Sequence, residues 1–237
     1  MTTDTLALRR AVAGLLSFAA AEEQALLAAE AFRPGSGGGS PDNWAAVPLV
    51  AHNNQFKTQQ AERIGCVLSG RVPPAYGEID HASAEVYQGY LAQPADAVLA
   101  ACRRVSAQLM DGTWTVPDED LLDPARHSWL NGRLLWLQIV VRGFWHPTGH
   151  LGEYYLTHGQ PARAVALQQQ GVAVACYLDA PAAAAGMASY SLACAQARAG
   201  QPEQAARTLA EAIEAHPDLR VNASRDPDLA VVRDASP

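Results

Sequence analysis

Residues 134–150 read LLWLQIVVRGFWHPTGH, and this stretch decides the kind of fold that the chain can form. Its first half is apolar on nearly every side of a helix, which is typical of a helix at the centre of a protein. Gly143 and Pro147 then disturb the run, so we expect a kink, or a stop and a restart, between Gly143 and His150. The stretch therefore predicts a helical protein built around this segment.

Three segments that precede the central stretch repeat apolar residues at helical spacing. We expect these helices at about Asp4–Ala31, Trp44–Leu68 and Ser83–Met110, the last one broken at Pro94. Asp4 is a suitable N-cap for the first of them. We expect residues 117–123 to form an acidic connection rich in turns.

The composition of the sequence changes after residue 160, where alanine becomes the dominant residue. Helices are expected at about 161–177, 182–199 and 202–216, and the last two should form an αα-hairpin that turns at Gly200. The pattern therefore predicts an all-α protein with a first domain over residues 1–160 and a second over residues 161–237.

Charge and hydropathy exclude several classes of function. The formal net charge is -7 and only 17% of residues are charged, which argues against binding to nucleic acid or to an anionic membrane surface. No uninterrupted apolar stretch of about 18 residues occurs, so we expect no membrane span. The N-terminus places an acid before its bases, so we expect no signal peptide. The four cysteines are scattered without a Cys-x-x-Cys pair, which predicts reduced, buried thiols in a cytoplasmic protein.

The histidines are the strongest candidates for a functional site. His146 and His150 are four residues apart, so on a helix they share one face and can reach one cation. His52 lies between Leu49 and Phe56 on the inward stripe of its predicted helix. A lone inward histidine is usually a hydrogen-bonded core residue, whereas three would leave six ring nitrogens to satisfy. Two interpretations stay open here: a divalent metal held by His52, His146 and His150, or histidines that are only hydrogen-bonded in the core.

Three other side chains are weaker candidates. Glu153 follows His150 by three residues, and could orient a ligand imidazole or a metal-bound water. The alternative for Glu153 is a solvated glutamate on the helix surface. His127 and His158 lie in predicted turns, and we expect both to face solvent.

Several segments of the first domain resemble one known family. HNNQF at residues 52–56 resembles the second-helix histidine segment of the DinB-like superfamily. DEDLLD at 118–123, WLNGRLLW at 129–136 and the histidine pair at 146 and 150 resemble its ClbS/DfsB branch. The resemblance covers roughly residues 5–160. It implies a four-helix bundle that binds one divalent metal through His52, His146 and His150, with coordination positions left open for water or substrate.

The same resemblance implies a class of activity. Some relatives are thiol-dependent transferases or isomerases that use mycothiol, bacillithiol or glutathione, and toxin-resistance members act on electrophilic small molecules. It therefore implies a divalent metal such as Zn or Ni, a low-molecular-weight thiol, a small-molecule substrate, a role in stress or toxin resistance, and homodimers. The chain departs from the branch at Pro147-Thr148-Gly149, because acidic residues usually stand there. The departure removes candidate general acids.

The second domain resembles a single tetratricopeptide repeat. The residues that carry this resemblance are Ala188–Cys194, Ala199-Gly200, Glu203–Ala205, Leu209, Ala212-Ile213 and a capping tail at Asp226–Leu229. One repeat does not usually bury its own apolar face, so these helices are expected either to cap the bundle or to bind a protein partner.

Three functions remain open from the sequence. The first is a metal-dependent thiol transferase or hydrolase acting on a small electrophile. The second is a non-catalytic binding or adaptor protein that uses the bundle and the C-terminal repeat. The third is a structural stress protein in which the histidines have lost their role.

Overall fold

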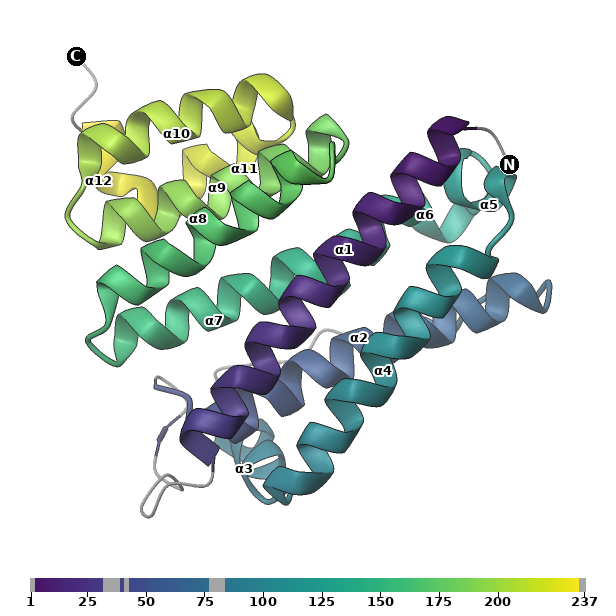
Figure 1. The fold of residues 1–237 in the computed structure, drawn as a ribbon, viewed down its shortest axis with the longest axis horizontal. Coiled ribbons are helices and arrows are strands. Elements are labelled where there is room, and N and C mark those ends of the chain that lie inside the picture. Colours follow the sequence, from purple (N-terminus) through teal and green to yellow (C-terminus); the bar gives the residue numbers. More distant parts are fainter. Residues whose placement is uncertain (1–2, 32–38, 41–42, 77–83, 235–237) are drawn as a thin grey trace. The chain divides into compact units, whose positions relative to one another are not determined.

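The computed structural model describes residues 3–31, 39–40, 43–76 and 84–234. Within those ranges the chain forms helices joined by turns, and the only β-type pairing is an isolated bridge between Ser40 and Asn43 (Figure 1). The predicted all-α class is therefore confirmed.

The chain divides into two compact units, Met1–Pro147 and Thr148–Pro237. The division falls inside helix α7 (His146–Thr157), earlier than the domain boundary predicted at residue 160. One contact that ties α7 to the C-terminal unit from its first turn onward is the hydrogen bond from the Gln168 amide to the Thr148 carbonyl at 2.8 Å. Each unit is described by itself below.

The first unit is built from helices that differ greatly in length. They are α1 (Thr3–Leu26) with the π-turn η1 (Leu27–Ala31), α2 (Ala46–Leu68), α3 (Ala84–Leu91), α4 (Ala95–Thr115), α5 (Asp118–Leu122), the 3-10 turn η2 (Ser128–Leu130), α6 (Leu135–Val140) and the π-turn η3 (Val141–Trp145). Helix α4 packs against both α1 and α2, and α1 also packs against α6 and η3. The break at Pro94 is confirmed, because Pro94 is the N-cap of α4.

The acidic connection after α4 is more regular than predicted. Residues 118–122 form the short helix α5 instead of a run of turns. Asp118, Glu119 and Asp120 occupy its first turn, where negative charge stabilises a helix N-terminus. The buried Arg9 of α1 binds the Asp118 carboxylate at 2.5 Å and so ties this helix to the start of the chain.

The expected disturbance of the central helix is a π-turn. It occupies Val141–Trp145, and regular helix resumes at His146, so the chain neither stops nor turns away. A Cβ on Gly143 would collide with the Leu16 side chain of α1 and lie 3.2 Å from Leu109 of α4. Glycine is therefore needed here for close packing rather than for flexibility.

A buried ion pair crosses the interior of the first unit. Lys57 of α2 lies 2.5 Å from the Glu23 carboxylate of α1, and their side chains are 1% and 0% exposed. The thiol of Cys102 in α4 lies 3.6 Å from the same carboxylate oxygen. Burial and the nearby Glu23 charge raise the pKa of Cys102 to about 12, so this thiol stays protonated at neutral pH.

The second unit consists of six short helical elements after α7. They are α8 (Pro161–Tyr177), α9 (Ala182–Arg198), α10 (Pro202–Ala215), α11 (Leu219–Arg225), the 3-10 turn η4 (Pro227–Leu229) and α12 (Ala230–Asp234). Helix α9 packs against both α8 and α10. A Cβ on Gly186 would lie 3.0 Å from the Ala212 carbonyl, which shows how closely α9 and α10 approach. Gly200 makes the turn between them with φ +76°.

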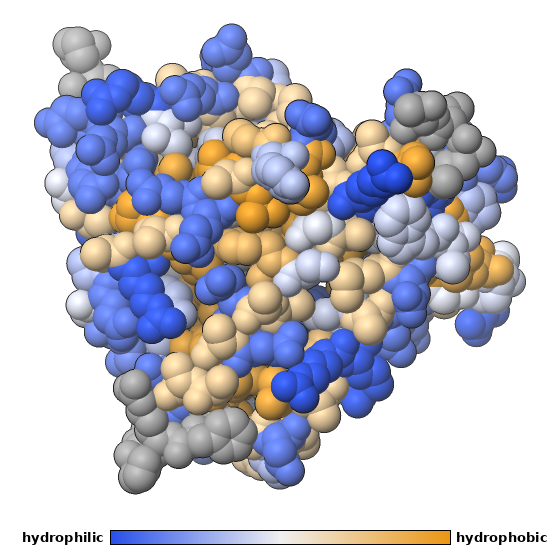
Figure 2. All heavy atoms as spheres, in the orientation of Figure 1, coloured by the Kyte–Doolittle hydropathy of each residue, from blue (hydrophilic) through white to orange (hydrophobic). Residues whose placement is uncertain are grey.

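Helix α10 is amphipathic, which explains which of its faces packs. Ala205, Leu209 and Ala212 are buried, whereas Glu203 and Glu211 are exposed. Figure 2 shows mainly hydrophilic residues over this part of the C-terminal unit.

The cysteines match the sequence expectation only in part. Cys66 and Cys102 are buried, as predicted, and all four thiols are free. Cys176 is exposed and Cys194 is partly exposed, so the prediction was wrong for these two. Cys176 lies in the last turn of α8 beside Tyr177, which is 86% exposed.

One helix passes a simple test for a membrane span. Residues Asp4–Glu30 are long and apolar enough by length and composition, although the sequence led us to expect none. Half of the most apolar window is buried inside the protein, as in the core helix of a soluble protein, and a signal sequence passes the same test. This is a weak indication of a span, and the expected absence of one stays a prediction.

The buried ion pair gives a test of the packing in the first unit. Lys57→Met leaves the Glu23 charge buried without a partner, so we expect the free energy of unfolding to fall by about 3–5 kcal/mol. The double variant Glu23→Leu/Lys57→Met should recover most of that loss, because neither charge remains. Urea denaturation measures both changes. The control is Arg126→Ala, which removes an ion pair whose arginine is 53% exposed; equal losses in Lys57→Met and this control would contradict the interpretation.

Candidate metal centre

The three predicted histidines come from two helices. His52 lies in the second turn of α2 and is 1% exposed. His146 is the first residue of α7, immediately after the π-turn, and His150 follows one helical turn later. Because α7 runs unbroken from His146 to Thr157, the prediction that His146 and His150 share a helix face is confirmed.

The ring nitrogens are close enough to share a cation. The Nε2 atoms of His52 and His146 are 3.1 Å apart. Two imidazoles bound to one Zn²⁺ at 2.0–2.1 Å would place their nitrogens about 2.9–3.4 Å apart, between right-angled and tetrahedral geometry. One ligand nitrogen from each of His52, His146 and His150 lies within 4.8 Å of the other two. The group could therefore hold a metal ion, as the sequence led us to expect.

Aromatic rings surround His52. The rings of Trp44 and Tyr90 meet it edge-on at centroid distances of 5.2 and 5.7 Å, and the Phe56 ring lies 4.9 Å away. Phe56 also lies 4.5 Å from the ring of His146. These contacts restrict the rotation of both imidazoles and provide apolar walls next to their nitrogens. The sequence predicted only that Phe56 faces inward; its contact with both histidines emerges from the packing of η3 against α2.

Tyr90 contributes a neutral hydroxyl to this wall. Its Oη donates a hydrogen bond to the Gln55 side-chain oxygen. Burial raises the pKa of Tyr90 above its usual value, so the hydroxyl stays protonated at neutral pH. Tyr90 therefore packs against His52 without bringing a charge to the site.

The weaker candidates lie elsewhere or behave differently from expectation. Glu153 is 45% exposed on the surface of α7, as the solvated alternative predicted, and it pairs there with the Arg198 guanidinium of α9. His158 is exposed as predicted, and it stacks on Tyr154 with ring centroids 4.0 Å apart. The prediction was wrong for His127, whose side chain is 12% exposed and lies 3.3 Å from the Asp120 carboxylate.

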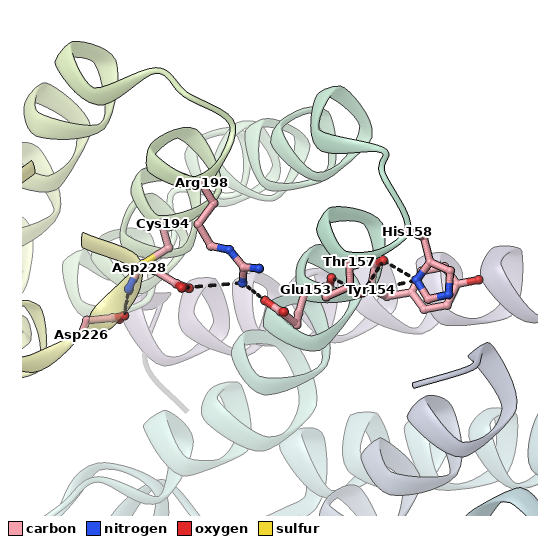
Figure 3. Close-up of polar contacts among 8 residues, drawn as sticks. All are labelled: Glu153, Tyr154, Thr157, His158, Cys194, Arg198, Asp226 and Asp228. Carbon is pink, nitrogen blue, oxygen red and sulfur yellow. Dashed lines mark hydrogen bonds and ion pairs between the residues drawn. The ribbon is translucent and has the colours of Figure 1, made fainter. Parts of the chain in front are cut away.

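A second group of potential metal ligands lies in the C-terminal unit (Figure 3). It consists of Cys194, Asp226 and Asp228. The Asp226 carboxylate accepts hydrogen bonds from the Tyr190 hydroxyl at 2.7 Å and from the Asp228 backbone N–H at 3.0 Å. Burial and the neighbouring carboxylates raise the pKa of the Cys194 thiol, so the free thiol stays protonated at neutral pH.

These bonds give the second group a structural role. Asp226 caps the 3-10 turn η4, and the Tyr190 hydroxyl fastens that cap to α9. Arg198 of α9 reaches both Glu153 and Asp228, the latter at 3.6 Å (Figure 3). The network therefore holds the C-terminal segment onto α9 and α7 by polar contacts.

Comparison with known proteins identifies no relative: no family model, no curated protein and no solved structure matches the chain. The two family resemblances therefore rest on the sequence motifs alone.

The histidine group predicts how metal content depends on single residues. His52→Ala, His146→Ala and His150→Ala should each lose the metal, because two remaining imidazoles hold a divalent cation far more weakly than three. The measurement is elemental analysis of protein purified without nickel resin. His158→Ala is the matched control and should keep the wild-type metal content. Stoichiometric metal in all three site variants would refute the assignment.

The second group predicts a loss of stability without a loss of metal. Tyr190→Phe removes a hydrogen bond to a carboxylate, so the free energy of unfolding should fall by about 1.5–3 kcal/mol. Metal content should equal that of the wild type. Loss of metal in Tyr190→Phe, with unfolding unchanged, would show that Asp226 belongs to a metal site instead.

Proposed function

We propose that the protein is a metal-dependent enzyme of the DinB-like kind that acts on a small electrophilic molecule. In this proposal residues 1–160 form the DinB-like four-helix bundle, and His52, His146 and His150 hold one divalent metal, Zn or Ni. The observation that carries it is that one ring nitrogen from each of the three histidines lies within 4.8 Å of the other two. The mutual packing of α1, α2, α4 and the α6–η3 segment supports the bundle.

The chemistry follows from the kind of ligands in the group. A divalent cation held by three neutral imidazoles supplies a Lewis acid that lowers the pKa of a bound water or thiol towards neutrality. The walls made by Trp44, Phe56 and Tyr90 reduce the access of water. Charges act more strongly in such surroundings than in bulk water.

The residues around the histidines favour transfer to a thiol over hydrolysis. Among the described residues the histidine group includes no carboxylate. Glu153 is engaged by Arg198, and the segment between His146 and His150 offers Pro147, Thr148 and Gly149. A hydrolase usually needs a general acid or base beside the reacting atoms. A thiol has less need of one, because its thiolate is already a strong nucleophile.

A non-catalytic binding or adaptor protein is the second candidate. In this alternative, helices 161–237 form a tetratricopeptide-like surface for a protein partner. The observation in its favour is the exposed aromatic side chain of Tyr177 at the end of α8, since tyrosine is enriched at protein interfaces.

Thiol transfer to a model electrophile tests the enzymatic proposal. With 1-chloro-2,4-dinitrobenzene, the thiolate sulfur forms a bond to the ring carbon, chloride leaves with the bonding electrons, and the thiol proton passes to buffer. Glutathione, bacillithiol and mycothiol are compared as donors. We expect the metal-loaded protein to accelerate the reaction with at least one of them.

The same assay separates metal-dependent catalysis from background. His146→Ala should lower kcat/KM by more than about 100-fold, because losing even an outer-shell partner of a metal ligand costs 10–100-fold. Chelation should abolish the activity, and added Zn²⁺ or Ni²⁺ should restore it, while His158→Ala should remain active. Full activity after chelation would refute the metal dependence, and no activity with any donor would favour the adaptor alternative.

A further inference from the structure

Two arginines, Arg63 and Arg142, lie on the same helix faces as His52 and His146. Arg142 precedes His146 by four residues in the π-turn that leads into α7. On α2, His52 is followed by Phe56 four residues later and by Arg63 seven residues after that. Residues at such spacings share one face of a helix. The two faces that bring the histidines together therefore also bring Arg63 and Arg142 to the same side of the first unit.

Ring contacts place Arg142 next to the histidine group. Its guanidinium carbon lies 4.6 Å from the centroid of the Phe56 ring. Because the Phe56 centroid is 4.5 Å from the His146 ring, the guanidinium carbon lies within about 9 Å of that imidazole. Arg63 lies over two other rings, 4.9 Å from Tyr76 and 5.8 Å from Trp129.

Neither arginine has an acidic partner among the described residues. Arg9, Arg126 and Arg198 each lie beside a carboxylate, whereas Arg63 and Arg142 pair with none in the described part of the chain. The chain has 24 acidic residues against 17 basic ones, so acids are not scarce. Arg63 has only a long contact of 3.5 Å to the Gln60 oxygen.

Arg142 also holds an unused hydrogen-bond donor. Its Nε atom is buried and donates to no described group, and leaving a buried donor unpaired costs about 1–3 kcal/mol. Burial lowers the pKa of Arg142, and the charges of Arg63 and Arg133 lower it further.

Packing alone does not account for this arrangement. Aromatic faces attract a guanidinium by about 0.5–1 kcal/mol at exposed sites, but they leave its N–H groups without acceptors. The planar guanidinium matches a carboxylate or phosphate through two parallel hydrogen bonds. Arg63 and Arg142 are both partly exposed, so an anion from solution can reach them.

We propose that Arg63 and Arg142 form a binding site for a carboxylate or phosphate group of the small molecule that this protein acts on. The distance from Arg142 to His146 limits that molecule to a compact anion whose reactive atom reaches the histidines. The role as a substrate subsite rests on the proposed function, whereas anion binding itself rests only on the arginines.

Titration with simple anions tests the site. Inorganic phosphate and succinate are titrated separately into metal-free wild-type protein, and binding is followed by calorimetry and by tryptophan fluorescence. At least one should bind saturably, and the tighter of the two identifies the preferred anion. Arg142→Gln and Arg63→Gln should each weaken binding by about tenfold or more, since one hydrogen bond to a charged group is worth about 1.5–3 kcal/mol.

Two controls make the outcome decisive. Arg104→Gln removes an exposed charge from α4 and should leave the affinity unchanged, whereas an equal loss there would show non-specific attraction. Arg142→Lys keeps the charge but lacks the planar guanidinium. Its affinity for the anion should lie between those of the wild type and Arg142→Gln. If Arg142→Gln does not fold, Arg63→Gln and Arg142→Lys decide the question. Unsaturable binding to the wild type, or wild-type affinity in these variants, overturns the proposal.

A histidine variant separates this proposal from the proposed function. His146→Ala should lose the metal but keep its affinity for the anion, because the arginines are untouched. Anion binding by wild-type protein that takes up no metal when Zn²⁺ or Ni²⁺ is added would leave the anion site standing and refute the metal-dependent enzyme. A metal-loaded, active protein that binds no anion would refute the anion site and leave the metal-dependent enzyme standing.

Discussion

The position of the candidate site depends on the close contact at Gly143. The π-turn around Gly143 touches the side chains of Leu16 and Leu109 so closely that no Cβ would fit. A π-turn hydrogen-bonds to the fifth residue instead of the fourth, so the helix that follows it is rotated relative to the helix before it. Helix α6 therefore buries Leu135 and Ile139 in the core, while α7 turns His146 towards His52.

Most helices could be predicted because their signals are local. Apolar spacing, Pro94 and Gly200 placed the long helices to within a few residues, since these residues restrict the backbone wherever they occur. The five residues of α5 could not be predicted in this way, because such a short helix depends on its tertiary contact with Arg9. The π-turn could not be predicted either. Gly143 indicates a disturbance of the helix, but the packing of the neighbouring helices decides whether the chain bends or continues.

The site was partly predictable for a similar reason. The spacing of His146 and His150 and the inward position of His52 are properties of single helices, so the sequence could nominate all three. The sequence predicted Glu153 as a solvated glutamate but not its ion pair, because its partner, Arg198, lies far along the chain. The sequence could not predict Arg63 and Arg142 as a pair. An arginine becomes a candidate for anion binding only when no acidic side chain lies beside it. That condition depends on the whole arrangement of the first unit.

Helix α2 carries His52 on one face and Lys57 on another, and the second face is the one that forms the buried ion pair with Glu23. Lys57 follows His52 by five residues, which places it about 140° further around the helix, where it meets Glu23 of α1. Buried ion pairs add little net stability, but separating the partners costs several kcal/mol. A rotation of α2 about its own axis would separate Lys57 from Glu23. The pair therefore fixes the rotation of α2, and with it the direction in which His52, Phe56 and Arg63 face η3.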